Sequence, residues 1–323
     1  LSLGSIGLVL CLVSVAICST YQIFMAISLT LGIVASSVSS TVFSFVAKNS
    51  KGNEITQRMS ILIAVSVMGI VSGRTVISIT SDYLDWRYGF AIYGVVTLVV
   101  FLLAMILYPR ENFISQNIFN SKNLLSIYLK SFKLYFRKTN FVLFAFGFIL
   151  FFSYIGITST LTYLLGSQPY SLSGKELGWF NMVGIVAVFG TLLNKKLETK
   201  LSFMTISRFS TSFFMFSIIT IFLSENLYFI LLGVFFLFLS VFMLQPIIIG
   251  FLSSIIEVEF KGIIPSLYLL SSLLGGAVGA YVLGSVYEHL GWSAAGLICI
   301  FSSTFLLIVT FNISKILNKS EVS

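Results

Sequence analysis

The stretch that decides the fold is GIVSGRTVISITSDYLDWRYGF, at residues 69–90, because a similar stretch returns 206 residues later. The second copy, GGAVGAYVLGSVYEHLGWSAAG, occupies residues 275–296, and five of the 22 aligned positions are identical. Each copy places two glycines four residues apart in an apolar run, then an acidic residue, then a tryptophan. The matched pairs are Gly69 and Gly275, Gly73 and Gly279, Asp82 and Glu288, Leu84 and Leu290, and Trp86 and Trp292. A helix that occurs twice predicts a chain built from two similar halves.

The residue types in this repeat are typical of a helix in a lipid bilayer. Glycines at positions i and i+4 leave a smooth strip on one helix face, which lets a neighbouring helix pack closely. We interpret as such a packing motif Gly69, Gly73, Gly275 and Gly279. Hinge bending at these glycines is the alternative interpretation.

The polar ends of the two copies predict where each helix leaves the membrane. Tryptophan beside charged residues is typical of the membrane–water interface. The predicted interface anchors are Asp82, Trp86, Arg87, Glu288 and Trp292.

The composition predicts a multi-pass membrane protein. Of 323 residues, 57% are apolar and 9% are charged, whereas an average soluble domain has about 25% charged residues. The mean hydropathy is +1.03. Cys11, Cys18 and Cys299 all lie in apolar segments, so we interpret them as small buried side chains and not as a disulfide or metal set. No metal site and no cofactor are predicted.

The apolar runs have the length of membrane-spanning helices. A helix that crosses a bilayer needs about 20 apolar residues, and a backbone in lipid must form helices or a closed barrel. The sequence therefore predicts an all-α membrane protein with about ten transmembrane helices. The predicted helices are residues 3–19, 22–46, 58–81, 89–108, 141–165, 178–193, 203–223, 227–255, 263–286 and 293–312.

Lysines and arginines are distributed unevenly between the two sets of loops. If the chain starts on the cytoplasmic side, sixteen of the 19 cations lie in cytoplasmic segments. Arg87 and Lys175 lie in loops on the other side of the membrane, and Arg74 lies within a helix. Cytoplasmic loops of membrane proteins carry this excess of positive charge. We therefore predict that both termini are cytoplasmic in a plasma (bacterial inner) membrane. The net charge of +8 then reflects topology, and no nucleic-acid partner is predicted.

The longest non-spanning segment divides the chain into parts. We predict an N-terminal part of four helices at residues 1–108, a cytoplasmic linker at 109–140, and a six-helix part with a short tail at 141–323. In the linker, apolar and aromatic residues are mixed with five cations, as in an amphipathic helix that lies on an anionic leaflet. A lipid sensor and a plain linker resting on the membrane both fit this pattern.

The position of the repeat implies a symmetry. The two copies lie in the third and ninth predicted helices, six helices apart. Because successive spanning helices alternate in direction, an even separation makes the two copies parallel. They would then be related by a two-fold axis along the membrane normal. The two halves of a major facilitator transporter have this relation.

The chain resembles the major facilitator superfamily, and within it the drug:proton antiporter and sugar-efflux (arabinose efflux permease-like) branch. In that branch helix five carries glycines followed by D-x-x-x-W-R-x-x-F. The corresponding residues here are Gly69, Gly73 and Arg74, then Asp82, Trp86, Arg87 and Phe90. Helix eleven ends similarly with Gly275, Gly276, Gly279, Gly284, Glu288, Gly291 and Trp292. The resemblance implies ten helices of a twelve-helix pattern, with two pseudo-symmetric halves and without the first two family helices.

Three features depart from the family pattern and leave the coupling ion open. The Gly/Asp/Arg-rich loop between family helices two and three is absent, and its counterpart at residues 194–202, NKKLETKLS, keeps only the positive charge. Where family helix four carries an arginine four residues before a glycine, this chain has Ser28 before Gly32.

Arg74 is the cation that needs an explanation. It lies eight residues before Asp82, which places it roughly 12 Å inside the boundary. A cation in mid-membrane costs about 2.5 to 3.5 kcal/mol, so it should face the protein interior or water and have a partner. Arg74 is predicted to bind substrate or to gate the central cavity, and a bracing role on neighbouring carbonyls is the alternative. No carboxylate lies deep in any predicted helix.

Other polar residues in apolar runs are predicted to contact substrate or to bond neighbouring helices. In lipid, amides and hydroxyls need hydrogen-bond partners. The residues singled out are Tyr154, Asn181 and Gln245, with Thr158 and Tyr163 beside the first.

The resemblance implies a secondary active transporter that works by alternating access. The leading hypothesis is proton-coupled efflux of a drug-like amphiphile or sugar by a monomer, with protons as the coupling ion. Nutrient uptake by the same fold, or a truncated non-transporting remnant, are the alternatives. A membrane enzyme would need clustered acids, histidines or a metal set at membrane depth. The one histidine, His289, lies in a predicted loop, so no enzyme activity and no catalytic residue are predicted.

Overall fold

The computed structural model describes residues 2–50, 54–107, 136, 138–197, 200–255 and 263–318, and these residues form helices joined by short turns. The first group of helices is α1 (Ser2–Ile17), α2 (Tyr21–Lys48), α3 (Glu54–Tyr83) and α4 (Trp86–Leu107). The second group is α6 (Lys138–Gly166), α7 (Gly174–Asn181), η2 (Met182–Ile185), α8 (Val186–Leu197), α9 (Phe203–Leu223), α10 (Leu227–Ile255), α11 (Ile264–Leu290) and α12 (Trp292–Asn318).

The prediction of an all-helical membrane protein is confirmed. Each of the ten predicted runs is helical, and the sixth is a continuous rod made of α7, the 3-10 turn η2 and α8. Within the described ranges, nine helices are long and apolar enough to cross a membrane, and α1 is shorter. The predicted amphipathic linker helix lies outside the described residues.

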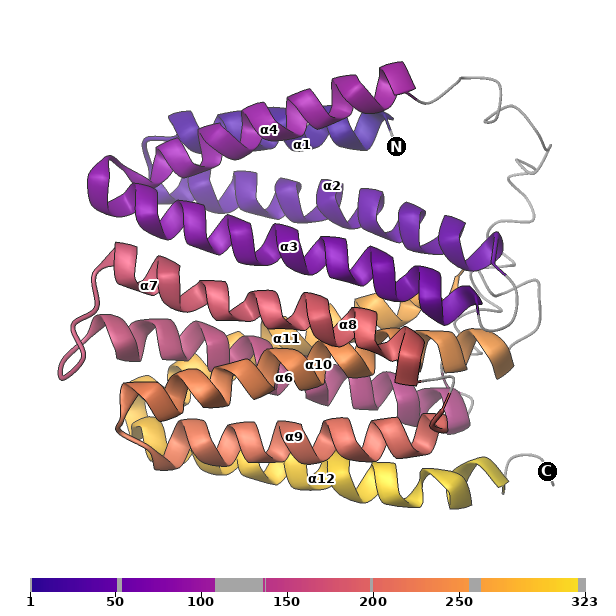
Figure 1. Ribbon diagram of the computed structural model, residues 1–323. Helices are drawn as coiled ribbons and strands as arrows, with labels where there is room; N and C mark the ends of the chain where they lie inside the picture. Colours follow the sequence, from indigo (N-terminus) through magenta and orange to yellow (C-terminus); the bar gives the residue numbers. More distant parts are fainter. Residues whose placement is uncertain are drawn as a thin grey trace.

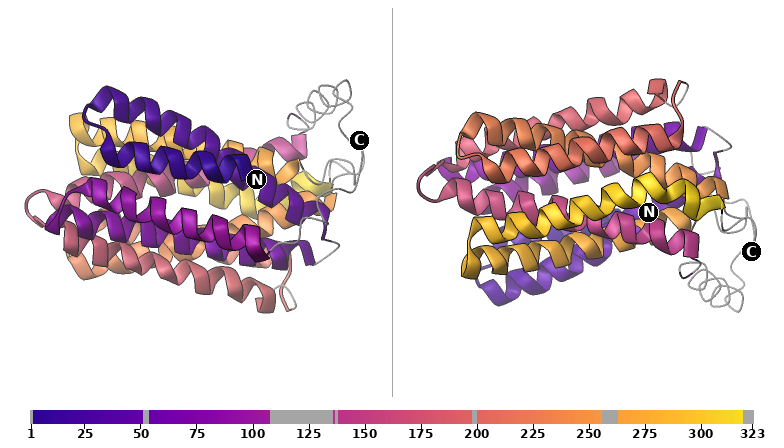
Figure 2. Two further views of the ribbon diagram at one scale, coloured as in Figure 1. Left: turned by 90° about the horizontal axis from the view of Figure 1, so that it is seen from above. Right: turned by 90° about the horizontal axis from the view of Figure 1, so that it is seen from below.

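The helices run side by side along one axis, with the two chain ends at the same end of the bundle (Figures 1 and 2). The α3–α4 and α11–α12 turns lie at the opposite end (Figure 1). Trp86 begins α4 and Trp292 begins α12, so the two matched tryptophans lie at one end, as the repeat requires.

Packing partners repeat along the chain. In the first group α1 contacts α2 and α4, and in the second group α9 contacts α10 and α12. The α3–α4 contact corresponds in the same way to α11–α12. The last four helices therefore repeat the neighbour relations of the first four, which supports two pseudo-symmetric halves.

α10 occupies the centre of the described bundle. It contacts α3, α6, α8, α9 and α11, and every residue from Val241 to Gly250 is buried. A helix that is apolar on all sides belongs inside a protein or a membrane. By contrast, none of the most apolar 18-residue window of α2 is buried within the protein.

The glycines of the second copy pack against another helix backbone. A Cβ atom on Gly275 would overlap the carbonyl oxygen of Phe148, and one on Gly279 would overlap that of Phe152. Both carbonyls belong to α6, which presents Gly156 to the backbone of Gly279 in return. The packing interpretation therefore describes the α6–α11 contact.

Gly69 and Gly73, the glycines of the first copy, do not pack against another helix backbone in the described residues, in contrast to the prediction. A Cβ on Gly69 would meet no atom within 4 Å, and one on Gly73 would meet only the Tyr93 ring, at 3.9 Å. The physical reason is that, among the described residues, no helix backbone lies against this strip of α3.

Candidate functional site

Arg74 lies on α3 and is partly exposed. It sits one helical turn from Val71, a buried residue of the α3 face that packs on the second group. Among the described residues it forms neither a hydrogen bond nor an ion pair, because the two ion pairs there join Arg58 to Glu54 and Arg87 to Asp85. The structure therefore gives this cation no carboxylate partner within those ranges.

Tyr154 is a buried residue of α6. Its side chain is 2% exposed, and its ring makes edge-to-face contacts with Phe238 and Phe242 of α10 at centroid distances of 5.3 and 5.4 Å. Its hydroxyl has no hydrogen-bond partner among the described residues. The fold thus places this predicted site residue among aromatic side chains.

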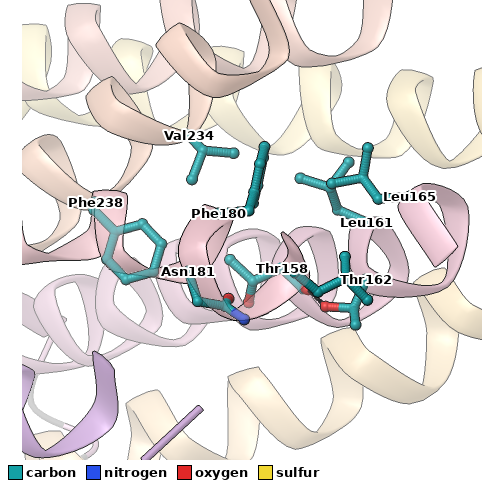
Figure 3. A pocket seen from close by; sticks show the side chains of 9 residues that line it. Thr158, Leu161, Thr162, Leu165, Phe180, Asn181, Val234 and Phe238 are labelled. Carbon is teal, nitrogen blue, oxygen red and sulfur yellow. Dashed lines mark hydrogen bonds between the residues drawn. The ribbon is translucent and has the colours of Figure 1, made fainter. Parts of the chain in front are cut away.

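Asn181 lines a small cavity between α6, α7 and α10 (Figure 3). The cavity measures about 20 Å³, and its polar lining residues are Thr158, Thr162 and Asn181. A water molecule needs at least about 10 to 15 Å³ of such space, so the cavity holds about one water and no larger solute. Tyr163 is 72% exposed and does not line it. Thr162, which the sequence reasoning missed, shares a helix face with Thr158 at the spacing i+4.

Gln245 is 5% exposed on α10, just before Pro246. Its side-chain oxygen has no hydrogen-bond partner among the described residues, and Gln245 is not among the residues that line the cavity at Asn181. A proline inside a helix removes one backbone hydrogen bond and kinks the helix. The structure therefore places Gln245 beside an opened turn and apart from Asn181.

Asn194 bonds α10 within the same turn and was missed by the sequence reasoning. Its side-chain nitrogen donates to the carbonyl oxygen of Met243 at 2.9 Å, and the side chain is fully buried. The predicted loop at residues 194–202 begins too early, because α8 continues to Leu197. Pro246 leaves the carbonyl of Phe242 without its helical donor, and Asn194 bonds the next carbonyl, so the sequence held no direct signal for this contact.

Replacing Asn194 with leucine is expected to lower the stability of the folded protein. The change keeps the side-chain size but removes a buried hydrogen bond, which contributes about 0.5 to 1.5 kcal/mol. The measurement is the thermal unfolding midpoint in detergent. The matched control is Asn312→Leu, because Asn312 is exposed and its amide donates to Ile308 of its own helix. Equal midpoints for the two variants would contradict this role.

Asp82 joins α3 to the start of α7, at the end of the bundle away from the termini. Its carboxylate accepts hydrogen bonds from the backbone N–H groups of Gly174, at 2.9 Å, and Lys175. The first N–H groups of a helix lack partners inside the helix and carry the positive end of its dipole. Asp82 was predicted as an interface anchor, and the structure adds this contact between helices 92 residues apart.

Two glycines of α7 let α3 approach this closely. A Cβ on Gly174 would lie 2.7 Å from the Ser78 carbonyl oxygen, and one on Gly178 would lie 2.8 Å from Ile79. Thr75 also donates to the Gly178 carbonyl at 3.2 Å. The sequence reasoning missed Gly174 and Gly178, although their i, i+4 spacing was the available signal.

The remaining predicted anchors lie at the same end. Trp86 contacts Phe24 edge to face with ring centroids 5.5 Å apart, and Trp292 lies 4.3 Å from Phe222. The Arg87 side chain forms an ion pair with Asp85 at 3.1 Å. It also donates a hydrogen bond to the backbone carbonyl of Cys18, which directly follows α1. Glu288 is exposed.

No metal centre is present in the part of the chain that the structure describes. There, no three His, Cys, Asp or Glu side chains lie close enough together to hold a metal ion.

The sequence matches the family model described as Major Facilitator Superfamily over residues 1–280. An uncharacterized transporter of Buchnera aphidicola subsp. Schizaphis graminum (strain Sg) is 25% identical over 333 residues, which cover 97% of this chain and 76% of the relative. The uncharacterized MFS-type transporter YybF of Bacillus subtilis (strain 168) is 26% identical over 186 residues, which cover 57% of this chain and 44% of the relative.

One solved structure extends the comparison to three dimensions. The crystal structure of the human organic anion transporter MFSD10 (TETRAN) superposes with a TM-score of 0.73 at 18% sequence identity. The superposition covers 97% of this chain and 76% of that one. At this identity the likeness concerns the fold alone.

Proposed function

This chain belongs to the Major Facilitator Superfamily, and from that premise we propose that it moves a small solute across a membrane by alternating access. Its relatives are named as transporters, not enzymes. The moving parts that we propose are residues 1–108 and 141–323, joined by the linker at 109–140. In such a transporter the halves rock about a central site, so contacts between them must form and break.

The observation that carries the proposal is the contact between α3 and α7, which joins the two proposed halves at one end. Asp82 and Thr75 of α3 bond the backbone of α7. At this end the contact is made by polar side chains of α3 and glycine backbone of α7. We propose that it is the closed gate of this conformation.

Contacts also join the proposed halves at the end that holds the termini. The Ser44 and Ser266 hydroxyls of α2 and α11 lie 2.9 Å apart, and Gly250 of α10 lies directly against Thr56 of α3. Small polar side chains again meet there, and we propose that this is the second gate.

We propose that the transported solute lies between these gates, where Arg74, Tyr154, Asn181 and Gln245 bind it or gate its path. The leading hypothesis is export of a drug-like amphiphile or sugar, coupled to protons, by a monomer in the plasma membrane with cytoplasmic termini. The apolar and aromatic surroundings of Tyr154 favour an amphiphile. The residues that line the cavity at Asn181 leave no room for a solute in the present conformation, so binding would require movement of the two parts.

The test is transport by the chain reconstituted in vesicles, with and without a pH gradient. The probes are ethidium as a drug-like amphiphile and labelled arabinose as a sugar, with protein-free vesicles as the control. We expect a protein-dependent flux of at least one probe that increases when an opposing proton gradient is imposed. If the flux instead increases when the proton gradient runs in the same direction as the solute, the result would favour uptake. No protein-dependent flux of either probe would contradict the leading hypothesis.

A further inference from the structure

The rod made of α7, η2 and α8 changes its hydrogen-bond pattern partway along. At the junction of α7 with η2, the backbone N–H of Met182 donates to the carbonyls of Trp179 and Phe180. In a regular α-helix it would donate to the carbonyl of Gly178, four residues earlier. The tighter 3-10 pattern then continues through Met182–Ile185. The Gly178 carbonyl is therefore left without its usual donor inside the rod.

Thr75 of α3 supplies the donor that this carbonyl lacks. Its hydroxyl donates to the Gly178 oxygen at 3.2 Å, and the bond is buried. Thr80 of the same helix donates instead to the carbonyls of Val76 and Ile77, which is the usual local bond of a threonine in a helix. Since α3 belongs to the first proposed half and the rod to the second, the bond from Thr75 crosses between the halves.

The junction also sets the direction of Asn181. Asn181 directly precedes η2 and lines the cavity together with Thr158 and Thr162 of α6 (Figure 3). The other end of the rod is held within the second half, because Asn194 of α8 bonds α10. A 3-10 stretch in the middle of a helix often marks a hinge. A change at this hinge turns α7, and with it Asn181, relative to α6.

Separation of the two halves at this end would remove the Thr75 hydroxyl from the Gly178 carbonyl. An unsatisfied carbonyl is costly in lipid, and the donor at hand in the rod is the Met182 N–H, which restores the α-helical bond. An α-helix turns by about 100° and rises about 1.5 Å per residue, against about 120° and 2.0 Å for a 3-10 helix. Over the four residues of η2, the change turns α7 by about 80° relative to α8 and shortens the rod by about 2 Å.

We infer that Thr75 is a positioning residue for Asn181. While the halves touch at this end, the Thr75 hydroxyl keeps the junction in its 3-10 form, and Asn181 lies beside the threonines of α6. When the halves part, the junction becomes α-helical and Asn181 turns away from α6. The inference rests on the proposed transport function and adds to it a link between the α3–α7 gate and the residues that line the path.

The experiment measures the distance between spin labels at Trp179 and Leu192, introduced after replacement of the three cysteines. Both side chains are exposed, at 59% and 47%, and they lie on opposite sides of η2 in one rod. The pair therefore reports the junction and not the movement of one half against the other. Thr75→Val keeps the side-chain shape and removes the hydroxyl. In this variant we expect a population about 3 Å longer, because at the radius of a spin label the rotation outweighs the shortening.

Two matched variants should keep the parent distance. Thr75→Ser retains the hydroxyl donor, and Thr80→Val removes a hydroxyl that bonds only its own helix. Asp82→Asn is an independent arm, because it weakens the α3–α7 contact without changing Thr75. It should also produce the longer population, whereas a residue that merely stabilises the junction locally would show no such effect.

Three outcomes would each overturn the inference. They are an unchanged distance in Thr75→Val, an equal change in Thr75→Ser or Thr80→Val, and an α3–α7 contact that opens in Asp82→Asn while the distance within the rod stays the same. The label distance needs no solute, so this test is separate from that of vesicle flux. A longer rod distance without flux of any probe supports the junction and contradicts the proposed transport, whereas flux with an unchanged distance removes the inference alone.

Discussion

Replacing Gly279 with leucine is expected to prevent the chain from folding in the membrane. Even a Cβ atom at this position would overlap the Phe152 carbonyl of α6, and Gly156 of the same helix lies against the Gly279 backbone. Backbone cannot move aside as a flexible side chain can, so α6 and α11 would have to separate along their contact. Close approach of this kind is the main source of helix association in lipid.

The loss of folded protein should be nearly complete. An enlarged core side chain usually costs about 1 to 3 kcal/mol, and the cost is larger when the added atoms meet backbone. The measurement is the amount of monodisperse protein after detergent extraction, by size-exclusion chromatography. The matched control is Gly284→Leu, five residues later on the same helix, where a Cβ would meet nothing within 4 Å. Normal yields of Gly279→Leu would show that the α6–α11 contact differs from the one described.

Replacing Asp82 with asparagine is expected to open the end of the bundle where α3 meets α7. The amide keeps one acceptor but loses the charge that two backbone N–H groups and the helix dipole stabilise. A hydrogen bond to a charged group contributes about 1.5 to 3 kcal/mol. Loss of that amount shifts the ratio of closed to open molecules about 10- to 100-fold.

The opening is measured as the distance between spin labels on the two sides of this contact. Leu84 and Tyr228 suit the labels, because both are exposed, at 66% and 81%, and lie next to helix ends on this side. The labels are introduced after replacement of Cys11, Cys18 and Cys299. In Asp82→Asn the distances should move to longer values. Glu288→Gln is the control, since Glu288 is the matched acid of the repeat and is exposed; a similar shift in both variants would refute a specific role of Asp82.

The sequence predicted the helices well because their signal is local. Apolar runs of spanning length mark each helix without reference to its neighbours, and all ten were found. The glycine pair at Gly275 and Gly279 lies against the α6 backbone. The identical spacing at Gly69 and Gly73 predicted the same role, yet no backbone lies against it in the described residues. A strip of small residues indicates that another helix can pack closely there, but it does not indicate which helix.

The candidate site was predicted only in part, since it depends on contacts between distant segments. Tyr154 was selected for being polar in an apolar run, and only the fold shows that its ring packs against Phe238 and Phe242. The bond from Asp82 to α7 was not predictable, because backbone N–H groups are present at every residue and leave no mark in the sequence. The orientation and the coupling ion remain predictions.

The enclosure of α10 limits how this part of the chain can vary. Every side chain from Val241 to Gly250 is covered by neighbouring helices, and each residue of an α-helix turns the next by about 100°. One inserted or deleted residue would therefore rotate all later positions onto the wrong neighbours, with no lipid-facing side to absorb the change. Relatives should differ in this segment by exchanges of similar volume and not by changes of length, whereas α2, which faces outward, has more freedom.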